Sequence, residues 1–304
     1  MDYDVVVIGG GAAGLSAALV LARARRRVAV IDAGEPRNAP AAQMHGFLSR
    51  DGMRPAHLLA VGRGEVIGYG GDIVRGRVRR IEPGFVVHSG GAPTLTARAV
   101  LVTTGLRDEL PDIPGVRERW GTDVVHCPYC HGYEVRDAPI GVLGGEERDA
   151  SMHQVLLVRQ WSADVIFFPG RLTPTAEDRE RLTARGIRIV DGDVARLVVT
   201  DDRLSAVELS DGRLVPRTAV FVAPRFVPHD DLLTDLGCAV DENGWVSTDP
   251  AGATSVPGVW AAGNVVNPRA QVITAAGAGS TAAAAINGYL VEDDIARSRR
   301  LVRT

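Results

Sequence analysis

The chain has 304 residues, of which 45% are hydrophobic and 23% charged, and its 34 basic and 37 acidic side chains leave a net charge of -3. At roughly 150 residues per domain this length predicts about two domains with packed cores, which excludes global disorder. The lack of a basic excess argues against a nucleic-acid partner.

The first elements predict a βαβ unit. The apolar run 5–8 indicates a strand buried on both faces, residues 15–24 are rich in Ala and Leu and indicate a helix, and 28–31 indicates a second strand that ends at Asp32. Between the first strand and the helix, residues 9–14 (GGGAAG) satisfy G-x-G-x-x-G. With strand, helix and acidic residue all in register, we expect this unit to bind a dinucleotide through its turn, its helix N-terminus and a ribose contact. The residues concerned are Gly9, Gly11, Ala12, Ala13, Gly14 and Asp32.

A second, smaller α/β unit is predicted further along the chain. A loop-rich stretch, 34–52, precedes strands expected at 73–81, 85–88 and 97–103, and Pro111, Pro114 and Gly115 then mark a domain boundary. Beyond it, strands are expected at 140–143, 165–168, 187–190, 203–209 and 219–222, and helices at 151–161 and 176–185.

The last part of the chain is expected to return to the first domain. It contains a strand at 259–262 and an uncharged stretch, 270–291, whose polar residues indicate a buried helix and not a membrane span. The predicted fold class is therefore α/β with two Rossmann-like dinucleotide-binding domains, the second inserted in the first, over residues 1–110, 111–240 and 241–304.

Three cysteines are too few, and odd in number, for the disulfide framework of a secreted protein, so we expect a cytoplasmic protein without membrane contact. Cys127 and Cys130 form a C-x-x-C, a spacing that lets two thiols close a disulfide and lowers one thiol pKa. Zinc is the competing interpretation. His126 and His131 each adjoin a cysteine, where joint chelation is awkward, so no metal is expected. Cys238 is interpreted as a small buried hydrophobe.

With this motif, the chain resembles the low-molecular-weight thioredoxin reductases over nearly its whole length. Segments 101–105 (LVTTG), 254–264 (TSVPGVWAAGN) and 270–279 (AQVITAAGAG) resemble FAD contacts of that family, with an amide at position 264 where the family has a carboxylate. The resemblance implies FAD, a homodimer and further cofactor contacts at Ala33, Arg37, Asn38, His45, Val78, Thr104, Gly105, Gly263, Asn264, Gln271 and Val272. Three of these, Arg37, Asn38 and His45, fit a substrate entrance or an ordinary polar loop equally well.

The resemblance also implies roles for the cysteines and for the histidines beside them. Cys130 would face the flavin, and Cys127 would exchange with substrate. His131 stands where the family usually has an acidic residue, and an imidazole that titrates near neutrality suits proton transfer to and from a thiol. His126 fits the same role or that of an exposed loop residue.

The second domain departs from the family. A G-x-G-x-x-A is expected for NADPH, yet residues 144–149 read GGEERD, and only Arg171 follows the next strand where a cluster of arginines is expected. Carboxylates near the phosphate positions repel them, so NADPH reduction is predicted to be disabled.

This departure, together with segment 127–134 (CPYCHGYE), makes the chain similar to the dithiol oxidases of the thioredoxin-reductase fold that close disulfides in natural products such as holomycin and gliotoxin. The resemblance implies a flavin enzyme that oxidises a small dithiol, passes the electrons to O2 to give peroxide, and serves antibiotic biosynthesis or self-protection. Two alternatives stay open: an NADPH-dependent disulfide reductase that binds NADPH through Arg148 or Arg171, and a flavin-binding redox sensor without catalytic turnover.

Overall fold

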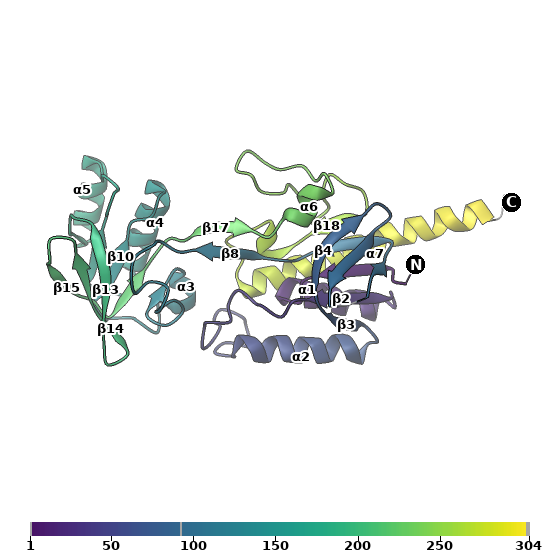
Figure 1. Ribbon diagram of the computed structural model, residues 1–304, viewed down its shortest axis with the longest axis horizontal. Coiled ribbons are helices and arrows are strands. Elements are labelled where there is room, and N and C mark those ends of the chain that lie inside the picture. Colours follow the sequence, from purple (N-terminus) through teal and green to yellow (C-terminus); the bar gives the residue numbers. More distant parts are fainter. Residues whose placement is uncertain (1, 92, 302–304) are drawn as a thin grey trace.

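Two parallel sheets organise the chain into two lobes, shown in a computed structural model that describes residues 2–91 and 93–301 (Figure 1). The first sheet has the strand order β18-β7-β1-β2-β3, with bounds Val259–Ala261, Ala99–Val102, Val5–Ile8, Val28–Asp32 and Asp72–Arg75. The second has the order β12-β11-β10-β16-β9, with bounds Arg188–Ile189, Val165–Phe168, Ile140–Leu143, Ala219–Phe221 and Val124–Val125. Both orders are typical of dinucleotide-binding folds, in which ligands bind at the carboxyl ends of the strands.

Each lobe has a small antiparallel sheet in addition. In the first lobe it comprises β4 (Arg77–Glu82), β5 (Val86–Gly90) and β6 (Leu95–Thr96), and in the second β13 (Val194–Thr200), β14 (Arg203–Leu209) and β15 (Leu214–Pro216). The antiparallel pair β8 (Leu106–Glu109) and β17 (Arg225–Pro228) connects the lobes. The chain therefore crosses between the lobes twice, along one ladder.

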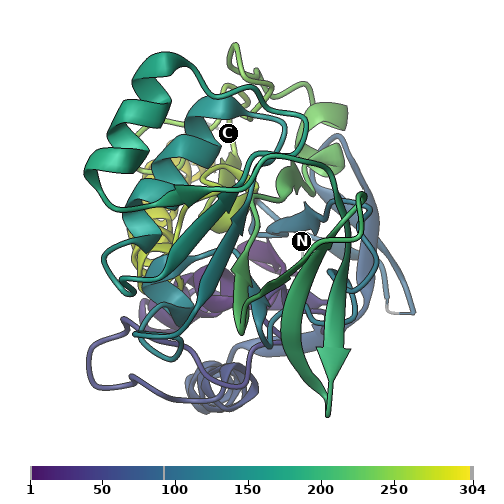
Figure 2. The ribbon, with the colours of Figure 1, turned by 90° about the vertical axis from the view of Figure 1, so that its left-hand side faces the viewer.

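Helices cover the outer faces of the sheets. Figure 2 shows α4 and α5 beside the second sheet, and the bounds are α1 (Ala12–Arg23), α2 (Pro55–Gly68), α3 (Pro128–His131), α4 (Arg148–Val158), α5 (Ala176–Ala184), α6 (Asp231–Asp235), the short helix η1 (Gly263–Val265) and α7 (Val272–Leu301). In the described part of the chain, no helix combines the length and apolarity needed to cross a bilayer.

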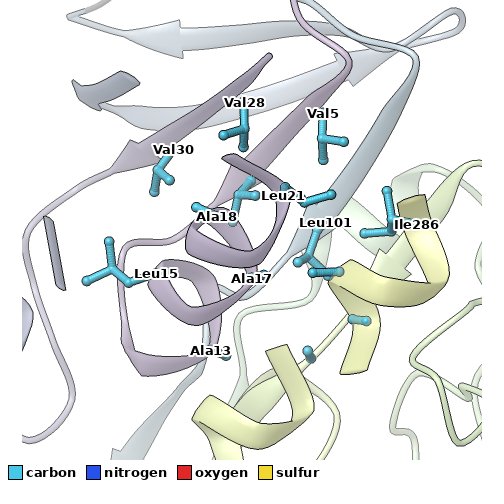
Figure 3. Close-up of a cluster of buried hydrophobic side chains, with 14 of the residues drawn as sticks. Val5, Ala13, Leu15, Ala17, Ala18, Leu21, Val28, Val30, Leu101 and Ile286 are labelled. Atoms are coloured by element: carbon cyan, nitrogen blue, oxygen red, sulfur yellow. The ribbon is translucent and has the colours of Figure 1, made fainter. Parts of the chain in front are cut away.

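Strand β1 is buried on both faces because its alternate side chains enter two different cores. Val5 and Val7 pack with α1 and α7, including Leu21 and Ile286 (Figure 3). Val6 and Ile8 point the other way and pack with β4, β5 and α6. A fully buried valine contributes roughly 1.5–3 kcal/mol, so this double burial fixes the strand that precedes the glycine turn.

Several elements differ from the sequence-based expectation, and three of these differences lie in the first lobe. The single strand expected at 73–81 is two strands in different sheets, because the chain turns at Gly76, whose amide donates to the Asp32 carbonyl. Helix α2 was not predicted because its two internal glycines, Gly62 and Gly64, lower helix propensity. Helix α7 is longer than the buried helix expected at 270–291, and Val291 is 42% exposed.

The predicted domain bounds, 1–110, 111–240 and 241–304, stay a prediction, and the packing of α6 bears on the second boundary. Leu232 and Leu233 of α6, together with Cys238, which is 7% exposed, pack in the core of the first lobe. This packing places the return to the first lobe at β17, ahead of residue 241.

Candidate active site

The glycine turn after β1 requires glycine at two positions. Gly9 has φ +106°, and a Cβ there would lie 2.5 Å from the Thr103 carbonyl oxygen. A Cβ at Gly14 would lie 1.9 Å from the Gly9 carbonyl oxygen. Thr103, which the sequence did not single out, holds this turn, because its buried hydroxyl lies 3.0 Å from the Ile8 oxygen and 2.9 Å from the Gly9 oxygen.

The N-terminus of α1 fits a dinucleotide. Ala12 and Ala13 form the first turn behind the N-cap residue Gly11, which provides no side-chain cap, and the turn contains no acidic residue. A Cβ built at Gly11 has no described atom within 4 Å. Free amides at the positive end of a helix, facing open space, suit a pyrophosphate.

Asp32 lies at the end of β2, beside this turn. Its Oδ1 accepts from the amides of Gly10 at 3.2 Å and Gly34 at 3.1 Å, and its Oδ2 lies 3.8 Å from Arg63. Ala33 follows directly, whereas Val78 packs into the core on β4. The carboxylate is therefore oriented by backbone amides at the position where a ribose hydroxyl would donate to it.

Two further segments reach the same edge of the sheet. After β7, the Thr104 hydroxyl donates to the His229 carbonyl at 2.6 Å, and Gly105, with φ +72°, has no described atom within 4 Å of a Cβ. After β18, Gly263 has φ +80° and a Cβ would lie 3.0 Å from the Ala13 Cβ. Parallel register brings these predicted cofactor positions together.

The amide at position 264 has a structural explanation. Asn264 Nδ2 donates to the carbonyls of Asn267 at 2.9 Å and Ala270 at 3.0 Å. A carboxylate cannot donate, so an aspartate here would face two acceptors. These two hydrogen bonds hold the loop 264–270. The loop leads directly to Gln271 and to Val272, where α7 begins.

The redox pair lies in the second lobe. Cys127 and Cys130 form a disulfide with a Cα–Cα distance of 5.2 Å. Cys127 is the N-cap of the short helix α3, and Cys130 lies within that helix. The amides of Cys130 and His131 both donate to the Cys127 carbonyl at 3.1 Å. No group of three His, Cys, Asp or Glu side chains suited to a metal ion occurs among the described residues.

The two neighbouring histidines differ in their surroundings. Burial lowers the pKa of His126 to about 4, helped by the nearby Arg37 guanidinium, and its ring stacks on Trp120 at 5.6 Å and meets Phe226 edge-on. A partly buried ring that stays neutral near pH 7 is less suited to the predicted proton-transfer role, which stays a prediction. Burial also lowers the pKa of His131. Both ring nitrogens of His131 are buried and have no hydrogen-bond partner among the described residues.

Loop 34–52 reaches the second lobe and not only the predicted cofactor site. Arg37 pairs with Asp108 on β8 through Nε at 2.8 Å and Nη2 at 2.6 Å, while Asn38 lies in the adjoining turn. Pro40 lies against Gly121, where a Cβ would be 2.8 Å from the Pro40 Cβ. Further along, a Cβ at Gly46 would lie 3.4 Å from Gln271 Oε1.

The same loop contacts the segment that follows the redox pair. His45 Nε2 lies 3.4 Å from Glu134 Oε1. Arg37 and His45 thus lie at the junction between the lobes, which sequence spacing alone could not show.

At the position expected for a nicotinamide dinucleotide, polar groups are already hydrogen-bonded to one another within the protein. The Gly145 amide donates to the Ser151 hydroxyl at 3.0 Å, and a Cβ at Gly144 would lie 2.5 Å from the Pro169 oxygen. Arg148 donates to the buried Asp178 through Nε at 2.8 Å and Nη2 at 2.7 Å. Arg148, one of the two arginines considered for NADPH binding, is thus already paired.

Comparison with known proteins agrees with this architecture. The sequence profile described as pyridine nucleotide-disulphide oxidoreductase matches residues 3–280. The chain is 31% identical over 319 residues to thioredoxin reductase sirT of Leptosphaeria maculans, covering 98% of each chain, and 31% identical over 281 residues to thioredoxin reductase tcpT of Claviceps purpurea, covering 86% of each. The crystal structure of HlmI superposes with a TM-score of 0.95 at 57% identity, covering 99% of this chain and 96% of HlmI. The predicted fold class and the resemblance to proteins of the thioredoxin-reductase fold are confirmed.

Proposed function

Since the chain belongs to the pyridine nucleotide-disulphide oxidoreductase family and is an FAD-binding flavoprotein, we propose that it oxidises a small-molecule dithiol to a disulfide, with O2 as the final acceptor. The coarser assignment, an oxidoreductase related to the thioredoxin reductases, follows from the family itself. A cytoplasmic location, a homodimer and a role in antibiotic biosynthesis or self-protection belong to the same proposal.

The pairing of Arg148 with Asp178 is the observation that supports this direction of electron flow. It occupies the Arg148 guanidinium in the segment expected to bind the NADPH phosphates, and the Ser151 hydroxyl accepts from the Gly145 amide. Glu146 and Glu147 add negative charge there. With this site unsuited to NADPH, thiols are the electron source that the Cys127–Cys130 disulfide can use.

Thiol–disulfide exchange gives the chain's part of the reaction. A substrate thiolate attacks Cys127, the Cys127–Cys130 bond breaks, and Cys130 leaves as a thiolate. The second substrate thiolate attacks the substrate sulfur of this mixed disulfide and releases Cys127, so that two electrons stay on the cysteine pair. His131 directly follows Cys130, and its ring nitrogens have no hydrogen-bond partner within residues 2–91 and 93–301, so this ring accepts the proton of an incoming thiol.

The first lobe supplies the groups that would hold FAD. The uncapped start of α1 would bind the pyrophosphate, Asp32 the adenosine ribose, and the segments at Gly105 and Gly263 would border the cofactor from the same sheet edge. Bound FAD supplies a two-electron acceptor that O2 can reoxidise.

Anaerobic titration of the FAD-loaded protein tests the proposal. Dithiothreitol should bleach the oxidised-flavin absorbance, and admission of air should restore it with one peroxide per dithiol oxidised. Bleaching by NADPH and not by dithiothreitol would overturn the proposal.

A second candidate is an NADPH-dependent disulfide reductase, which the similarity to thioredoxin reductases sirT and tcpT favours. It predicts saturable bleaching by NADPH in the same titration. A redox sensor without turnover predicts neither repeated dithiol consumption nor peroxide.

A further inference from the structure

A segment of the first lobe runs alongside the redox pair. It comprises residues 37–45 of the loop between β2 and α2, and we call it the strap. At one end of the strap, Arg37 Nη2 lies 3.5 Å from Nε2 of His126, the residue directly before the pair. At the other end, His45 Nε2 lies 3.4 Å from Oε1 of Glu134, which follows the pair in sequence. The strap therefore contacts the chain on both sides of the reacting disulfide.

Both ends of the strap are held by acidic side chains. Arg37 donates to Asp108 through Nε at 2.8 Å and Nη2 at 2.6 Å, and its guanidinium lies 5.0 Å from the centre of the Phe226 ring. The Asp108 side chain is only 8% exposed, so salt screens this ion pair little. The His45–Glu134 contact is weaker, because the Glu134 side chain is 43% exposed. The end at Arg37 is thus the firmer anchor of the strap.

The middle of the strap contacts the second lobe as well. A Cβ built at Gly121 would lie 2.8 Å from the Cβ of Pro40, so the two segments touch there. The turn that carries the redox pair still reaches the surface, because Tyr129, between the two cysteines, is 62% exposed. The strap therefore lies beside the pair and leaves the turn open to solvent.

This arrangement affects small and large dithiols differently. A small dithiol needs only a path along which its thiolate can attack one sulfur of the pair. A dithiol on a folded protein must also bring the surrounding protein surface into contact, and even weak electron-transfer complexes bury up to about 1,200 Å² in total. The strap occupies one side of the pair, over which such a surface would have to lie.

We propose that the strap, held through Asp108 and Glu134, restricts the redox pair to small-molecule dithiols by preventing a folded protein from docking over it. This inference rests on the dithiol oxidation proposed above and names the class of dithiol that is excluded. The exchange is the same for every dithiol: two substrate thiols become one disulfide, and the Cys127–Cys130 bond is reduced to two thiols. Two electrons and two protons pass to the cysteine pair, and only access to the pair depends on the strap.

The rate at which dithiols reduce the Cys127–Cys130 disulfide tests the inference without requiring turnover. FAD-loaded, oxidised protein is mixed anaerobically with dithiothreitol, with reduced thioredoxin as a folded protein dithiol, or with the linear peptide of thioredoxin's own C-x-x-C segment. Free thiols are alkylated at set times and counted by mass spectrometry, and the flavin absorbance records electrons that have already passed on. We expect dithiothreitol and the peptide to reduce the disulfide, and thioredoxin to do so at least about tenfold more slowly than the peptide.

The double variant Asp108→Asn/Glu134→Gln loosens both ends of the strap and leaves its own sequence unchanged. Trypsin should cleave after Arg37 faster than in the wild type, and the rate constant with thioredoxin should rise about tenfold or more relative to that with dithiothreitol. The matched control is Glu109→Gln/Glu180→Gln, because Glu109 lies beside Asp108 on β8 but pairs with arginines outside the strap, and Glu180 is exposed on α5. The control should be cleaved and reduced as the wild type is.

Three results would overturn the inference: reduction of the wild type by thioredoxin as fast as by the peptide, cleavage after Arg37 that is no faster in the double variant, or faster cleavage without a gain for thioredoxin. If Asp108→Asn prevents folding, seen as loss of bound flavin, the comparison of peptide and thioredoxin in the wild type still decides. If dithiols reduce the disulfide but no oxygen is consumed in air, the proposed function fails, while the exchange rates still decide the inference about access.

Discussion

Arg148 at the start of α4 and Asp178 in the first turn of α5 form a two-point ion pair, although 30 residues separate them. Asp178 also accepts from the Thr175 amide at 2.8 Å and is 1% exposed. The pair ties together the two helices that follow β10 and β11. The Arg148 guanidinium, which could bind phosphate in a nucleotide site, instead joins α4 to α5 through Asp178.

The pair predicts an acid-dependent stability. Burial alone would raise the pKa of Asp178, but the Thr175 amide and Arg148 outweigh it, and the net pKa is lowered from 3.8. The stabilisation is therefore complete above pH 3.8 and is lost as pH falls through the lower pKa of the folded state. Asp178→Asn should cost about 1–2 kcal/mol at pH 7 in urea unfolding and flatten the acid slope. Asp191→Asn, in an exposed pair, should stay near wild type, and equal losses in both variants would contradict the prediction.

We predict that replacing either cysteine of the redox pair abolishes turnover and leaves FAD bound. Cys127→Ser and Cys130→Ser should each lower dithiol oxidation by roughly 1000-fold or more, since neither can form the exchanging disulfide. Both should keep bound flavin, because the groups expected to hold it lie in the other lobe. Oxygen consumption with dithiothreitol and the flavin absorbance of the purified protein measure the two quantities. Cys238→Ser, remote in the first core, is the control and should oxidise dithiothreitol at the wild-type rate.

We predict that replacing Asn264 by aspartate lowers the affinity for FAD. In Asn264→Asp the carboxylate faces the carbonyls of Asn267 and Ala270, so the loop before Gln271 loosens. We expect the Kd for FAD to rise about tenfold, a cost of about 1.4 kcal/mol, measured by titrating apoprotein with FAD. Asn267→Asp is matched, because Asn267 Oδ1 accepts from the Arg269 amide and an aspartate can do the same. A higher affinity in Asn264→Asp than in the wild type would refute this assignment.

The lowered pKa of His126 predicts that the free energy of unfolding depends on pH in a second range, between about 4 and 6.5. Its pKa falls from 6.5 to about 4, first through burial and then through Arg37. Because the unfolded chain binds the proton more readily, this contribution is complete above pH 6.5 and is lost as pH falls towards 4, by at most about 3 kcal/mol. His126→Gln should flatten the stability curve over that window, whereas His57→Gln on exposed α2 should not. Unchanged curvature in His126→Gln would show that the ring is not buried in its neutral form.

The sequence predicts best those elements that local pattern determines. The apolar runs that form β1, β10 and β11 are found at their expected bounds, since a strand covered on both faces shows as an uninterrupted run. The glycine turn and the cysteine pair are equally local, because each requires residue types at a fixed spacing.

What the sequence could not show depends on contacts between distant residues. The partner of Arg37 lies on the connecting ladder and that of His45, Glu134, lies in the second lobe. Asp178 meets Arg148 only once α4 and α5 pack. Thr103 lies within segment 101–105, but the contact of its hydroxyl with the glycine turn comes from the register of β7 beside β1. The roles of these residues become apparent only when the three-dimensional structure shows which distant residues they contact.

Loop 34–52 has a mechanical consequence. Through Arg37, Pro40 and His45 a segment of the first lobe contacts the connecting ladder and two places in the second lobe. Rotation of one lobe against the other would separate all three contacts at once. Heat should therefore melt the two lobes in a single calorimetric transition, and a cut in this loop should split that transition into two.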